Sequence, residues 1–222
     1  MKVSLLTPTR KRPELMLKMA RSALATGNNF EFVFYVDEDD TLTDSGIAQL
    51  PAPIVKVVRG PRIPCGQCWQ KAFEASTGDI LMMCADDLIF HTTGWDAVVG
   101  AEFEAVPDRI LFVFGNDGIQ FEALGTHGFV HRRWTEAVGY FTTPYFMSYY
   151  TYTWMDRLAK FCGRRKYLPG LNIEHIHPCV GKRPMDETSS QLGGGALIDT
   201  ELFAKLEGVA RTDAAKLIAA LR

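Results

Sequence analysis

Short apolar runs alternate with amphipathic segments through the first half of the chain. Runs rich in β-branched and aromatic residues predict strands at 2–8, 30–40, 53–60 and 79–87. Apolar residues recur at helical spacing in 12–26 and 66–77, and a glycine follows each segment. This order of strands and helices predicts an α/β fold, in which helices flank a mostly parallel central sheet.

The pattern is less regular in the second half. It predicts a strand at 109–117, a strand and a helix within 125–141, a helix at 150–161 and a strand within 166–178. The tail at 199–222 contains two helical segments, which predict a short helical C-terminal extension. Residues 189–195, rich in serine and glycine, predict a mobile loop.

Polar residues gather where the predicted strands end. The positions are Thr9-Arg10, Asp37-Glu38, Asp86-Asp87, Asn116-Asp117 and His175. In an open α/β sheet, ligands bind at the carboxyl ends of the strands. The sequence therefore predicts a binding site at this edge.

Composition excludes several classes of protein. The net charge is −2 and 47% of the residues are hydrophobic, which argues against disorder and against a general nucleic-acid binder. The basic clusters 132–133, 164–166 and 182–183 are typical of solvated surface, although they leave a polyanionic partner open. We find no transmembrane segment and no signal peptide, so the expected compartment is cytoplasmic. Five cysteines at irregular spacing do not indicate a disulfide framework.

Asp86 and Asp87 end an apolar run. Two carboxylates at the end of a buried strand repel each other and lose hydration, so a positive charge is expected nearby. A divalent cation, Mg²⁺ or Mn²⁺, prefers oxygen ligands and often shares its shell with substrate phosphates. The alternative is an N-cap aspartate beside a solvated one.

Five segments resemble, in order, the motifs of family 2 type glycosyltransferases, which have the GT-A fold. They are "VSLLTPTRKRPELMLKMARSAL", "FVFYVDEDD", "AFEASTGDILMMCADD", "FVHRRWTEAVGYF" and "GRRKYLPGLNIEHIHP". Together they span about 2–178, most of the chain. The resemblance implies a GT-A domain at 1–180, with a nucleotide-binding half at about 1–96 and an acceptor half at about 97–180. A flexible loop and the helical C-terminal extension would follow at 181–222.

The resemblance also implies roles for particular residues. Pro8, Thr9 and Arg10 would line the nucleotide pocket, and Asp37 would contact the base or ribose with help from Glu38. Asp86 would lie near the ribose. Asp87 would bind Mn²⁺ or Mg²⁺, and His175 or His177 would be a further ligand of the metal or diphosphate.

The chain departs from the family pattern at two places. Cys84 replaces the leading acid of the metal motif. The acid that would act as catalytic base in inverting members is expected at Thr151 or Tyr152, and neither is an acid. Asp156, one helical turn later, and Asp117, at a strand end, are the candidates. Asp156 is alternatively a surface charge paired with Lys160.

The expected function is transfer of a sugar, with inversion, from a nucleotide-diphosphate-sugar donor to a hydroxyl acceptor. The acceptor could be a glycan, a protein, a small molecule or a modified DNA base. The missing base motivates one alternative, a catalytically inactive relative that binds the donor. Another is a nucleotidyltransferase, and a third is a redox protein built on Cys65 and Cys68. His127, between glycines, contacts the acceptor or belongs to a surface loop.

Overall fold

The computed structural model describes residues 1–147, 149–192 and 196–221. Their strands form one eight-stranded sheet in the order β3-β2-β1-β4-β7-β6-β8-β5. The bounds are β1 (Val3–Thr9), β2 (Phe30–Asp37), β3 (Val55–Gly60), β4 (Ile80–Met83), β5 (Leu88–Phe90), β6 (Phe112–Asn116), β7 (Phe129–His131) and β8 (Arg165–His175).

The sheet is mixed. The pairs β1·β2, β1·β4, β2·β3 and β6·β8 are parallel. Strand β7 runs antiparallel to both β4 and β6, and β5 runs antiparallel to β8. The first half thus has the predicted strand and helix order, and its four parallel strands β1, β2, β3 and β4 end at one edge.

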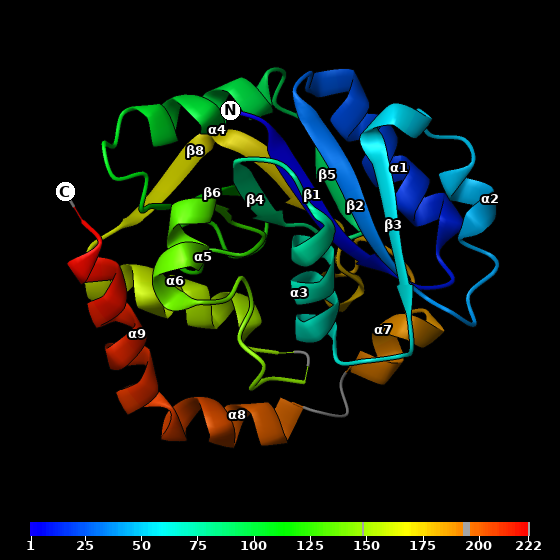
Figure 1. Cartoon of the computed structure of the whole chain (residues 1–222). Helices are drawn as coiled ribbons and strands as arrows, with labels where there is room; N and C mark the ends of the chain where they lie inside the picture. Colours follow the sequence, from blue (N-terminus) through cyan, green and yellow to red (C-terminus); the bar gives the residue numbers. More distant parts are fainter. Residues whose placement is uncertain (148, 193–195, 222) are drawn as a thin grey trace.

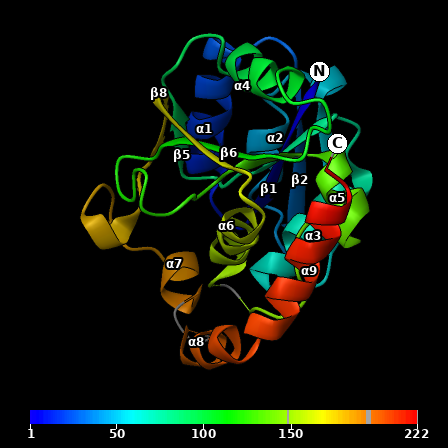
Figure 2. The same ribbon diagram turned by 90° about the vertical axis from the view of Figure 1, so that its left-hand side faces the viewer.

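Helices cover both faces of the sheet (Figures 1 and 2). One buried cluster joins the sheet to α1 (Pro13–Thr26) and α4 (Trp95–Glu104). The other joins it to α3 (Cys65–Ala75), α5 (Arg132–Val138), α6 (Thr151–Cys162) and α9 (Glu207–Ala219). Short helices α2 (Asp44–Ile47), η1 (Ala52–Ile54) and α8 (Ala196–Lys205) complete the connections. None of the described helices is both long and apolar enough to cross a membrane.

The helical C-terminal segment packs into the second cluster. Leu217 of α9 is fully buried, and Asp213 accepts a hydrogen bond of 2.6 Å from the hydroxyl of Tyr140. The same hydroxyl accepts from the indole N–H of Trp154 at 2.9 Å. Helix α9 is therefore part of the core rather than a peripheral addition.

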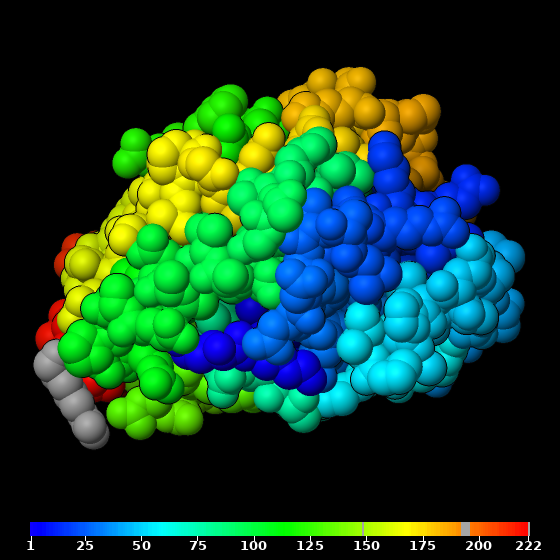
Figure 3. Space-filling view, turned by 90° about the horizontal axis from the view of Figure 1, so that it is seen from above, coloured from blue at the N-terminus to red at the C-terminus, as the bar shows by residue number. Residues whose placement is uncertain are grey.

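Residues 176–192, termed the strap below, leave the end of β8 and pass through η2 (Pro178–Val180) to α7 (Glu187–Leu192). In Figure 1, α7 lies beside the carboxyl ends of β1 and β3, and in Figure 3 the orange strap lies against blue atoms of the N-terminal part. The predicted loop at 189–195 is wrong for Ser189–Leu192, which are helical; 193–195 lie outside the described residues. The helix forms because Asp186 caps it, accepting from the backbone N–H of Ser189 at 2.7 Å.

Candidate functional site

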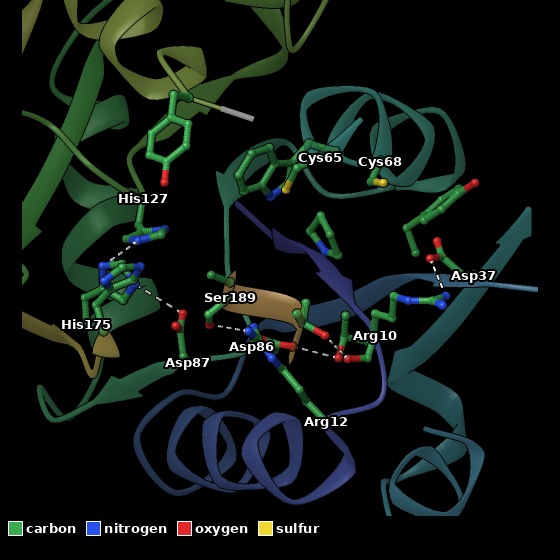
Figure 4. A pocket seen from close by; sticks show the side chains of 18 of the residues that line it. Arg10, Arg12, Asp37, Cys65, Cys68, Asp86, Asp87, His127, His175 and Ser189 are labelled. Atoms are coloured by element: carbon green, nitrogen blue, oxygen red, sulfur yellow. Dashed lines mark hydrogen bonds and ion pairs between the residues drawn. The ribbon is translucent and has the colours of Figure 1, made fainter. Parts of the chain in front are cut away.

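A cavity of about 200 Å³ lies at the carboxyl ends of β1, β2 and β4, closed by the start of α3, by α6 and by the strap (Figure 4). Most of the residues singled out from the sequence line it. They are Pro8, Thr9, Arg10, Asp37, Asp86, Asp87, His175 and His177. Residues from positions 8 to 177 thus meet in one place, as the strand-end pattern predicts.

Arg10 and Asp37 form one end of the cavity. Nη1 of Arg10 donates to Oδ2 of Asp37 at 2.7 Å, and the same guanidinium contacts Asp39 at 2.5 and 2.9 Å. Asp37 is buried, whereas Glu38 is exposed and lies outside the cavity lining. The structure therefore brings Asp37, but not Glu38, to the site.

Asp86 is buried between two donors. The hydroxyl of Thr9 donates to its Oδ2 at 2.9 Å, and Nη1 of Arg12 donates to Oδ1 at 3.1 Å. Burial raises the pKa of Asp86 to about 6; Arg12 opposes this shift and the charge of Asp87 adds to it. Arg12 thus provides one of the positive charges that the acid pair requires.

Asp87 is held by His175 and Arg183. Nε2 of His175 lies 3.2 Å from Oδ1, and Nη2 of Arg183 donates to Oδ2 at 3.1 Å. Burial alone would raise the pKa of Asp87, but the contacts with His175 and Arg183 hold it below its ordinary value. Asp87 is therefore a carboxylate at neutral pH.

His175 and His127 extend the hydrogen-bond network of Asp87 into the interior. Nδ1 of His175 lies 3.3 Å from Nε2 of His127, whose Nδ1 lies 3.1 Å from the carbonyl oxygen of Met83. Burial lowers the pKa of His127 to about 3, so this ring is neutral. Because a carbonyl only accepts, His127 carries its proton on Nδ1, and Nε2 accepts from His175. The network therefore directs Nε2 of His175 toward Asp87. His127 is a buried part of the site, not a surface-loop residue.

Asp87 and His175 provide two ligand atoms suited to Mn²⁺ or Mg²⁺. Within the described residues, no group of three or more His, Cys, Asp or Glu side chains is arranged to hold a metal. Mg²⁺ commonly uses one or two carboxylates and completes its shell with substrate phosphates and water. The residues therefore fit a cation that is shared with a diphosphate, and not a cation held by protein alone.

The two candidates for the catalytic base are not among the residues that line the cavity. Asp117 accepts from the backbone N–H groups of Ile119 and Gln120 and from the hydroxyl of Thr126, at 2.7–2.9 Å. These contacts fix the loop after β6. The structure does not bring Asp117 into the cavity lining.

Asp156 is buried and forms ion pairs with Arg165 at 2.5 Å and Lys160 at 2.6 Å. The expected pairing with Lys160 is present, although Asp156 is not on the surface. Tyr152, one of the two positions at which the resemblance implies the base, does line the cavity. Burial raises the pKa of Tyr152 above its ordinary value, so its hydroxyl stays protonated.

Cys65 and Cys68 line the cavity from the first turn of α3. Burial raises the pKa of both thiols, that of Cys68 to about 12. Burial therefore disfavours the thiolate form that the redox alternative requires. Cys84 is fully buried in the core.

Arg12 and Arg183 belong to the site, and sequence reasoning did not assign them there. Arg12 lies between β1 and α1, where Pro13 begins the helix. Arg183 stands in a basic pair that is typical of surface, yet its side chain is only 10% exposed. A signal for both was the acid pair itself, which requires nearby cations.

No family model matches the chain, and no curated protein matches it in sequence. Solved structures do match its fold. The structure of Staphylococcus aureus (S. aureus) TarS 1–349 in complex with UDP-GlcNAc has a TM-score of 0.69 at 13% identity, covering 99% of this chain and 71% of that one. Mannosyltransferase PcManGT from Pyrobaculum calidifontis, in complex with GDP-Man and Mn²⁺, has a TM-score of 0.64 at 14% identity, covering 99% and 74%.

A longer S. aureus TarS structure matches with a TM-score of 0.64 at 12% identity over 79% of this chain. The present chain spans 36% of its length. At these identities the similarity concerns the fold alone. Together with the mixed sheet and its two helical layers, it shows a GT-A-like fold with a helical C-terminal part.

Proposed function

We propose that the protein is a family 2 type glycosyltransferase, which transfers a sugar from a nucleotide-diphosphate donor to a hydroxyl acceptor. One observation carries the proposal: Thr9, Arg10, Asp37 and Asp86 line a single cavity that ends at the facing pair Asp87 and His175. GT-A-like neighbours solved with UDP-GlcNAc or with GDP-Man and Mn²⁺ support it.

In this proposal, Asp37 and Arg10 contact the nucleoside, and Asp86 accepts from the ribose. The donor leaves as a diphosphate, so negative charge develops on its oxygens. His177 accepts from the backbone N–H of Cys179 at its Nδ1, at 3.2 Å, and burial lowers its pKa. Its neutral ring therefore carries a proton on Nε2, which can donate to the leaving group. Mn²⁺ or Mg²⁺, held by Asp87 and His175, would act as a Lewis acid toward this charge.

The position of the acids favours a second candidate function, a donor-binding protein without sugar transfer. Among the described residues that line the cavity, the only carboxylates are Asp37, Asp86 and Asp87. Asp156 or Asp117 would act as the base of an inverting reaction only after release from its present partners. Transfer and donor-hydrolysis assays distinguish this candidate from the enzyme.

Calorimetric titration of UDP, GDP, CDP, ADP and TDP, with and without Mn²⁺, tests donor binding. We expect Mn²⁺ to tighten binding of one nucleotide, and Asp87→Ala to reduce that affinity by about tenfold or more. Glu38→Gln is the matched control, because Glu38 is acidic and near the site but exposed. If no nucleotide binds the wild type, the proposed function is wrong.

A further inference from the structure

Two arginines cover the acid pair from the side of the strap. Arg12 donates to Asp86 and Arg183 to Asp87, each at 3.1 Å. Both guanidinium side chains are only 10% exposed. Buried guanidinium groups of this kind are suited to bidentate recognition of carboxylates and phosphates.

Asp186 of the strap lies between the two guanidinium groups. Its Oδ1 accepts from Nη2 of Arg12 at 2.6 Å, and its Oδ2 accepts from Nη1 of Arg183 at 2.8 Å. The hydroxyl of Ser189 contacts the same two groups, at 2.5 and 2.9 Å. An anion with one oxygen on each guanidinium thus bridges them, as a phosphate group would.

The arginines have more donors than the strap satisfies. Nε of Arg12 and Nε of Arg183 are both buried, and neither has a hydrogen-bond acceptor among the described residues. Buried donors normally have partners. A diphosphate would bring more acceptor oxygens than the carboxylate and hydroxyl that lie there now.

The volumes and linings of two neighbouring cavities also support a diphosphate site. The inner cavity, about 200 Å³, is smaller than the about 300–1,000 Å³ typical of small-molecule sites. A second cavity of about 600 Å³ lies beside it. Arg12 lines both cavities, whereas Arg183 and Asp186 line only the second. The ion pairs of Asp186 therefore form part of the wall between them.

We infer that Arg12 and Arg183 form an anion subsite for the donor's diphosphate, and that Asp186 occupies this subsite when no donor is bound. The inference rests on the proposed function, and Asp186 is the competing anion. The diphosphate displaces the carboxylate of Asp186, which releases α7 and joins the two cavities. Asp186 thus weakens donor binding while stabilising the empty site.

Titration of the metal-free full chain with inorganic pyrophosphate and with nucleoside diphosphates tests the inference. Asp186→Asn keeps the size and helix-capping ability of the side chain but removes its charge. We expect it to tighten pyrophosphate binding by about three- to tenfold, because a competing anion is neutralised. Glu187→Gln, the adjacent exposed acid, is the control and should change nothing. Arg183→Gln should weaken binding by about tenfold or more.

Amide hydrogen exchange of the wild type gives a readout that needs no variant. Pyrophosphate should speed exchange in 187–191, because α7 is released. Unchanged or weaker pyrophosphate binding by Asp186→Asn, or no binding by either protein, would overturn the inference. If nucleotides bind the wild type and Asp186→Asn equally, the proposed function survives and the inference does not. If pyrophosphate alone binds, and more tightly to Asp186→Asn, the inference survives and the proposed function does not.

Discussion

At the scale of single residues, the clearest contrast is between acids that line the cavity and acids that hold the structure together. Asp156 shows the second kind. It pairs with Arg165 and Lys160, and it also accepts from the backbone N–H of Gly125 at 3.1 Å. These contacts tie α6 to β8 and to the loop before β7.

We expect Asp156→Asn to lower the free energy of unfolding by about 3 kcal/mol, because Arg165 would lose its buried partner. Urea unfolding measures this loss. Lys160→Gln is the control and should cost at most about 1 kcal/mol, since the lysine is half exposed. A large loss of sugar transfer at unchanged stability would instead identify Asp156 as the catalytic base.

The structure brings together the residues that were singled out by their local position. Asp37, Asp86 and His175 follow or end strands, and the carboxyl ends of neighbouring parallel strands meet at one edge. The same reasoning did not identify the two arginines of the site. Arg12 reaches Asp86 across 74 positions and Arg183 reaches Asp87 across 96, and no spacing rule connects them.

At the scale of elements, Glu31 joins the beginnings of neighbouring strands. From β2 it accepts from the ammonium of Lys2 at 2.7 Å, from the hydroxyl of Ser4 at 2.8 Å and from the backbone N–H of Thr77 at 2.6 Å. It therefore connects β1, β2 and the approach to β4 at the edge opposite the cavity.

This contact makes stability depend on pH. Burial opposes the shift, but the hydrogen bonds from Lys2 and Thr77 lower the pKa of Glu31 from 4.5 to about 2. Between these values the unfolded state binds more protons, so the contribution of Glu31 is present above pH 4.5 and is lost as pH falls toward 2. We expect wild type to lose about 2–3 kcal/mol more than Glu31→Gln over this range, measured by urea unfolding. Parallel pH curves would contradict this prediction.

Hydrophobic periodicity predicted most helices and strands, because the residues of an apolar face repeat at a spacing that is typical of each kind of element. It failed for α7, whose residues "ETSSQL" have no apolar stripe. The helix depends on the cap from Asp186 and on the contact between the Thr188 hydroxyl and the carbonyl oxygen of Arg10, at 3.2 Å. Such tertiary contacts are not visible in local sequence.

At the scale of the whole molecule, α9 completes one of the two cores. Its residues Ala210, Ala214 and Leu217 are buried against α5 and α6.

We expect Leu217→Ala to lower the free energy of unfolding by about 2–5 kcal/mol, through lost burial and an unfilled cavity. Ile218→Ala is the matched control. That side chain is 50% exposed, and its loss should cost about 1 kcal/mol or less. Equal losses in thermal or urea unfolding would show that α9 does not pack as described.

The distance along the chain between Asp87 and Arg183 has a consequence for biosynthesis. At about 5–20 residues per second, a ribosome adds the arginine roughly 5 to 20 s after the aspartate. The residues of β1, β2 and β4 have been synthesised by then, and so has Arg12, the partner of Asp86. Asp87 gains its partners only after His175 and the strap have been synthesised. The nascent sheet therefore carries the Asp87 carboxylate at its edge without these partners until residue 183 has been synthesised.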